Sequence, residues 1–153
     1  MSALSFFRKK TFFSTDEYTR IVEAIRVAEN ETSGEIRVYI EQKNPITYPI
    51  KRAHTIFYKL KMQETMHRNA VLIYIATQPR SLTLFADEGI YKSYSSEYWN
   101  NAVADIIKKI TETNICDGIV ECIERIGQLL KEKFPYTVSI EKNELPDEIV
   151  FGK

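Results

Sequence analysis

The feature that most constrains this chain is an apolar run near its middle, Ala-Val-Leu-Ile-Tyr-Ile-Ala at positions 70–76. The run has the length of a β-strand, but it lacks the alternation of apolar and polar residues that a strand with one face in water would show. Such a run is typical of a central strand that is covered on both faces. The chain therefore needs helices on both sides of its sheet.

Hydrophobic spacing along the rest of the chain predicts those helices and three more strands. The expected helices cover residues 15–30, 49–64, 96–110 and 114–134. The expected strands cover residues 35–41, 70–76, 81–86 and 136–141. Ser14, Ser96 and Asn114 are placed to cap three of the helices. The order αβαββααβ predicts an α/β fold, a three-layer α/β/α sandwich with a small mixed central sheet.

Composition argues against several kinds of partner. The 21 basic and 21 acidic residues balance, so no net field attracts nucleic acid, and nucleic acid is not expected as a partner. The sequence contains no stretch of about 18 apolar residues, so no transmembrane segment is expected. The first residues lack the apolar region of a signal peptide, which favours a cytoplasmic protein. Phosphate-binding GxxxxGK[ST] loops and GxSxG nucleophile elbows are both absent from the sequence.

The predicted topology brings three polar segments together. The first two strands are joined by a helix, so they should run parallel and begin at the same edge of the sheet. The short connection after the second strand permits only an antiparallel third strand, which returns to that edge. Residues 32–35, 65–69 and 87–89 should therefore meet there.

Several of these residues carry oxygen atoms that suit a hard cation. Carboxylates of Glu35, Asp87 and Glu88, together with the amide oxygen of Asn69, are ligands of the kind that Ca²⁺ and Mg²⁺ prefer. The edge is therefore a candidate divalent-cation site, with Asp87 as the first ligand. The alternative interpretation is that these polar residues cap strand ends and that Asp87 forms a turn with Gly89.

Two arginines near the same edge suit an anion. Arg37 and Arg68 would hold a phosphate by paired hydrogen bonds, and they are the candidate substrate-binding residues. A competing rule places ligands at the carboxyl ends of parallel strands, which here means residues 41–44 and 77–80. That edge shows no clustered carboxylates, so we favour the first edge.

Ordered blocks of the sequence carry a family resemblance. They are SGEIRV at 33–38, VLIYIA at 71–76, ADEGI at 86–90, FP at 134–135 and NELPD at 143–147. At these intervals they resemble the TPM domain family, also called the TPM phosphatase family, and look like its short, soluble, bacterial type. The resemblance covers about residues 14–148. It leaves residues 1–13 as an N-terminal arm and 149–153 as a C-terminal tail.

The resemblance implies an α/β/α sandwich and a bound divalent cation such as Ca²⁺. It does not imply one shared activity: acid phosphatase activity is reported for thylakoid members of the family, and phosphatase-type hydrolysis of a phosphoester is the activity considered for this chain. In that reaction the ion would offset phosphoryl charge and activate water. The rival function is a non-catalytic interaction or assembly module that binds a protein partner, because no nucleophile or second acidic cluster is evident. Function follows the site and not the fold.

Overall fold

The computed structural model describes residues 13–45, 48–110, 114–136, 146 and 148–152. Its helices are α2 (Thr15–Glu29), α3 (Pro49–Lys59), α4 (Glu88–Ser93), α5 (Ser96–Ile110) and α6 (Ile115–Lys133). Its strands are β1 (Glu35–Glu41), β2 (Ala70–Thr77), β3 (Arg80–Ala86) and β4 (Val150–Phe151). The predicted strand 136–141 falls almost entirely outside the described residues.

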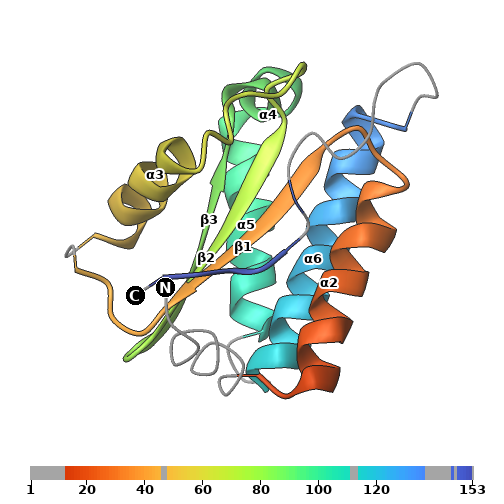
Figure 1. Cartoon of the computed structure of the whole chain (residues 1–153). Helices are drawn as coiled ribbons and strands as arrows, with labels where there is room; N and C mark the ends of the chain where they lie inside the picture. The colour runs from red at the N-terminus through yellow and green to blue at the C-terminus, as the bar shows by residue number, and fades with distance from the viewer. Residues whose placement is uncertain (1–12, 46–47, 111–113, 137–145, 147, 153) are drawn as a thin grey trace.

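The strands form one mixed sheet in the order β3-β2-β1-β4. β1 and β2 are parallel, β3 is antiparallel to β2, and β4 runs parallel to β1. Helix α3 lies on one face of this sheet, and α2, α5 and α6 lie on the other (Figure 1). The predicted three-layer sandwich is therefore confirmed, with β2 as a central strand buried at every position but its last.

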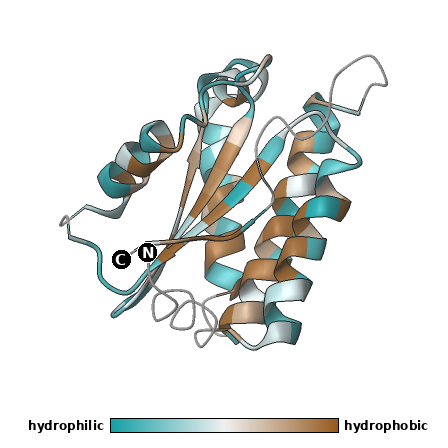
Figure 2. Ribbon diagram, in the orientation of Figure 1, coloured by the Kyte–Doolittle hydropathy of each residue, from teal (hydrophilic) through white to brown (hydrophobic). Residues whose placement is uncertain are grey.

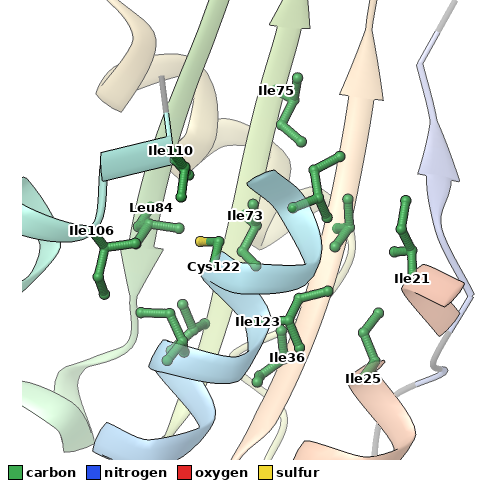
Figure 3. Packing of buried hydrophobic residues seen from close by; sticks show 14 of the residues in the cluster. Ile21, Ile25, Ile36, Ile73, Ile75, Leu84, Ile106, Ile110, Cys122 and Ile123 are labelled. Atoms are coloured by element: carbon green, nitrogen blue, oxygen red, sulfur yellow. The ribbon is translucent and has the colours of Figure 1, made fainter. Parts of the chain in front are cut away.

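Apolar side chains fill both spaces between the layers. The larger cluster joins the sheet to α2, α5 and α6, and Figure 3 shows its isoleucines meeting from both sides, such as Ile36 and Ile73 against Ile123. The smaller cluster lies under α3 and contains Phe57, Leu72 and other residues. Figure 2 shows β2 brown over most of its length, whereas β1 and the helices carry both brown and teal. This pattern is that of a sheet covered on both faces.

Two local predictions need correction. Ser96 is the first residue of α5, and the cap is Ser95, whose Oγ accepts the Tyr98 N–H at 3.1 Å. Residues 88–93 form the short helix α4, which the sequence patterns did not indicate. The capping box of α2 at Ser14 is present as expected.

The C-terminal residues take part in the sheet. Val150 and Phe151 pair with Tyr39 and Ile40 of β1, although the range 149–153 was expected to be a tail. The Phe151 ring lies 6.4 Å from that of Phe13, which is buried just before α2. The two ends of the described chain therefore meet through these two rings.

Candidate functional site

The three polar segments meet at one edge of the sheet, as the topology predicted. The Asp87 N–H donates to the Ala70 carbonyl at 3.0 Å, and the Gly89 N–H donates to the Arg68 carbonyl at 2.8 Å. The Asn69 side-chain amide donates to the Ser33 hydroxyl at 3.3 Å. Figure 1 shows the segment between α3 and β2 passing beside α4. These contacts link the start of β1, the start of β2 and the end of β3.

Two buried carboxylates lie in one row across this edge. Glu35 of β1 pairs with Ala70 of β2, and Asp87 follows β3 opposite the same alanine. Residues that pair across strands share a face, and Ala70 packs in the cluster under α3. Glu35 is 1% exposed and Asp87 2%. Within this row, only Ala70, which has a small side chain, stands between Glu35 and Asp87.

Asp87 is held by a positive charge. Arg68 donates from Nε to Oδ2 at 2.7 Å and from Nη2 to Oδ1 at 2.9 Å, while the Glu88 N–H donates to Oδ1 at 2.7 Å. The hydrogen bond to Asp87 is the main cause of the raised pKa of Arg68. Since the Arg68 side chain is 34% exposed, it has room to move outward. A cation at Asp87 would have to displace it.

Neutral oxygen atoms with no partner lie in the segment that precedes β2. Asn69 Oδ1, Thr65 Oγ1 and Gln63 Oε1 are buried and accept no hydrogen bond. Met62 in this segment packs in the same cluster as Ala70, and the Asn69 side-chain amide donates to the Ser33 hydroxyl. Buried polar atoms are nearly always satisfied, and exceptions indicate a ligand, an ion or a water.

Glu88 does not join the buried row. Its side chain is 52% exposed and contacts Lys92 at 3.2 Å and Arg68 at 3.5 Å. The hydrogen bond from Lys92 and the nearby Arg68 lower its pKa. Within the part of the chain that the structure describes, no three Asp, Glu, His or Cys side chains group closely enough to hold a metal ion. An ion here would depend on neutral oxygens as well as carboxylates.

Arg37, the other predicted anion ligand, sits apart from this ion pair. It lies two residues beyond Glu35 on the same face of β1, and its Nε is buried without a hydrogen-bond partner. Burial lowers the pKa of the Arg37 guanidinium, and Glu148 only partly opposes the effect. Among the described residues, Arg68 is paired with a carboxylate, whereas the Arg37 Nε has no hydrogen-bond partner.

The opposite edge holds a polar network that the sequence analysis missed. Arg52 of α3 donates to both oxygens of Glu41 at 2.8 Å, and the Tyr74 hydroxyl donates to the same carboxylate. Burial alone would raise the pKa of Glu41, but these hydrogen bonds outweigh it and lower that pKa. The sequence signal that could have indicated this network is the alternation of polar residues along β1, which ends at Glu41.

Comparison with known proteins decides the family. A model of the TPM domain matches residues 7–129. This chain belongs to the TPM domain family. Among solved structures, this TPM domain is similar to the BA42 protein of the psychrophilic bacterium Bizionia argentinensis, determined by NMR, with a TM-score of 0.82 and 37% identity. The similarity covers 92% of this chain and 96% of that one. A comparison with curated proteins found no match.

Helix length and polarity set one further property of this TPM domain. Among the described residues, none of the helices combines the length and the apolar composition that crossing a membrane requires.

The candidate site is an edge of the sheet that combines Glu35, Asp87, Asn69 and Thr65, with Arg68 bonded to Asp87 and Glu88 turned to the surface.

Proposed function

We propose that this TPM domain binds a divalent cation, Ca²⁺ or Mg²⁺, at the edge formed by Glu35, Asn69 and Asp87. The observation that carries the proposal is the pair of buried carboxylates on either side of Ala70. Together they carry the charge that neutralises a divalent ion. The unpartnered Asn69 Oδ1 and Thr65 Oγ1 add neutral oxygens of the kind that complete a Ca²⁺ coordination shell.

Binding would exchange one positive charge for another at Asp87. Arg68 holds both carboxylate oxygens, so an ion that binds Asp87 has to release the guanidinium toward solvent. The cost is moderated because Arg68 is exposed on one side and keeps Glu88 as a second acidic neighbour at 3.5 Å. We therefore expect a moderate affinity for the ion rather than a very tight one.

Phosphoester hydrolysis is the second candidate, and the position of Arg68 favours it. An arginine released from Asp87 would be free to hold an anion beside the ion by paired hydrogen bonds. A bound ion would supply charge neutralisation and an activated water. The alternative is a non-catalytic module in which the ion only orders residues 65–69 and 87–89 for a protein partner.

Thermal unfolding of the metal-stripped protein with and without millimolar Ca²⁺ or Mg²⁺ tests the proposal. An ion at about 100 times its dissociation constant adds about 2.7 kcal/mol, or about 5–10 °C for a domain of this size. Asp87→Asn should remove this shift, while Asp105→Asn, which alters an exposed ion pair on α5, should retain it. Because Asp87→Asn also loses the Arg68 pair, the compared quantity is the ion-induced shift.

Two results would contradict cation binding at this edge. One is a wild-type protein whose melting temperature does not respond to either ion, and the other is an equal response in Asp87→Asn. If the ion binds, hydrolysis of a generic phosphomonoester separates the remaining functions. Turnover that disappears in Asp87→Asn supports the enzyme, and an ion-induced shift without turnover supports the module.

A further inference from the structure

Residues 42–63 concentrate positive charge in a chain whose total charge is balanced. This segment contains five basic residues and no acidic one, and removing these five from the 21 basic residues of the chain leaves 16 against 21 acidic residues. Within the segment, the charge of Arg52 is neutralised by Glu41. The other four basic residues are exposed lysines: Lys43, Lys51, Lys59 and Lys61. The balanced total therefore hides a local excess of positive charge around α3.

Cations on the other side of the sheet provide a contrast. The Lys109 ammonium of α5 lies 3.5 Å from the Asp105 carboxylate. The Lys131 ammonium of α6 lies 2.7 Å from the Glu31 carboxylate. Within the part of the chain that the structure describes, none of the four lysines around α3 forms an ion pair. A cluster of exposed, unpaired positive charges favours a negatively charged partner.

Apolar side chains accompany the lysines on the side of α3 that faces away from the sheet. The buried side of the helix consists of Ala53, Ile56 and Phe57. In contrast, Ile50 is 54% exposed, Tyr58 is 40% exposed, and Tyr48, which precedes the helix, is 67% exposed. Lys51 lies seven residues before Tyr58, close to two helical turns, so these two side chains share one side of the helix. We call Ile50, Lys51, Tyr58 and Lys59 the outer face of α3.

We propose that the outer face of α3 binds the surface of a membrane rich in anionic lipid. Each lysine near such a surface strengthens binding about fivefold. Tyrosine is enriched where lipid meets water, and lysine can hold its ammonium among the headgroups while its stem contacts apolar groups. Helix α3 lies on the opposite face of the sheet from α2, α5 and α6 (Figure 1), so those helices do not block the approach of a flat surface.

An acidic protein is the rival partner for this face, and the kind of cation decides between the two. Protein–protein interfaces are enriched in arginine and depleted in lysine. Arg52, the one arginine of the segment, is already bonded to Glu41, and the exposed cations around α3 are all lysines. The composition of the face therefore favours lipid headgroups.

Co-sedimentation with vesicles tests the proposal, using metal-stripped protein in EDTA so that Ca²⁺ cannot bridge carboxylates to lipid. The vesicles contain equal parts of phosphatidylcholine and phosphatidylserine, and vesicles of phosphatidylcholine alone are the lipid control. The test variant is Lys51→Gln combined with Lys59→Gln. The matched control is Lys109→Gln combined with Lys131→Gln, which removes the same charge from α5 and α6.

We expect binding to the anionic vesicles that weakens as the salt concentration rises and falls about 25-fold in the test variant. The matched control should change binding by less than about threefold, because its lysines lie on the other side of the sheet. Absence of binding at low salt, or an equal loss in the two double variants, overturns the proposal. Binding to poly-glutamate without binding to vesicles overturns it in favour of an acidic protein. Asp87→Asn should bind vesicles as the wild type does, which keeps this test separate from the cation site.

Fluorescence of Ile50→Trp identifies the face that touches lipid. Trp99, the single natural tryptophan, is 1% exposed, so its emission should not respond to vesicles. The indole introduced on the outer face of α3 should emit at shorter wavelength as anionic vesicles are added, because it moves from water into the lipid interface. Emission that stays unchanged while the variant sediments with the vesicles shows that another surface is bound, which refutes the assignment to α3.

Discussion

Gly89→Ala probes how closely the candidate site is built. A Cβ placed on Gly89 would lie 2.2 Å from the His67 carbonyl oxygen and 2.6 Å from that of Arg68. Both obstacles are backbone atoms, and the Gly89 N–H also donates to the Arg68 carbonyl. No side-chain rotation can relieve this overlap. The substitution must therefore push α4 and residues 67–68 apart.

The expected cost follows from two opposing effects. Overpacking costs about 1–3 kcal/mol, and contact with backbone places Gly89→Ala at the upper end of that range. Alanine in a helix recovers about 1 kcal/mol relative to glycine. The net loss is about 2 kcal/mol, which lowers the melting temperature of a domain of this size by about 4–8 °C. Because Arg68 and Asp87 are displaced from each other, the cation response should fall as well.

Thermal unfolding followed by circular dichroism measures the loss, with Gly34→Ala as the matched control. A Cβ on Gly34 meets the Leu130 Cδ1 at 2.9 Å, the end of a side chain, and its nearest backbone atom, the Asn69 carbonyl oxygen, lies at 3.3 Å, so its cost should be about 1 kcal/mol or less. If Gly89→Ala is as stable as the wild type, or if the two variants are equally destabilised, the close approach of α4 to residues 67–68 is not as described.

Three further predictions concern the opposite edge and the thiols. Arg52→Met should lower the free energy of unfolding in denaturant by about 3 kcal/mol, because Glu41 stays buried without its cation, and a loss below about 1 kcal/mol would contradict this. The folded-state pKa of Glu41 is depressed, so its stabilising contribution is present above the ordinary value of 4.5 and is lost as pH falls through the lower folded value. Glu41→Gln should therefore flatten the acid side of melting temperature plotted against pH. Burial raises the pKa of Cys122 to about 12 and also raises that of Cys116, so rapid labelling of either thiol in the folded protein would be unexpected.

The layers of the fold were predictable because periodicity reports burial. The apolar run 70–76 required cover on both faces, and α3 opposite α2, α5 and α6 provides it. The convergence of the three polar segments followed from one parallel crossover and one tight connection. Chain direction alone placed residues 87–89 at the edge where β1 and β2 begin.

Side-chain partners were beyond that reasoning. Arg68, which binds Asp87, has a backbone φ of 52°, a left-handed conformation that local sequence does not signal. The Arg52–Glu41 pair joins a helix to a strand end across a loop, so no periodicity reveals it. Helix α4 was missed because its six residues are too few to show a hydrophobic period.

The two polar edges of the sheet differ in how completely their buried polar atoms are hydrogen-bonded. At the carboxyl edge, the Glu41 carboxylate accepts hydrogen bonds from Arg52 and Tyr74. This network is complete, and a structural role accounts for it. At the other edge, Asn69 Oδ1 and Thr65 Oγ1 are buried with no hydrogen-bond partner. A closed network gains little from a ligand, whereas an open one gains the bonds that it lacks. The open edge is therefore where binding should be sought, against the rule that favours the carboxyl ends of parallel strands.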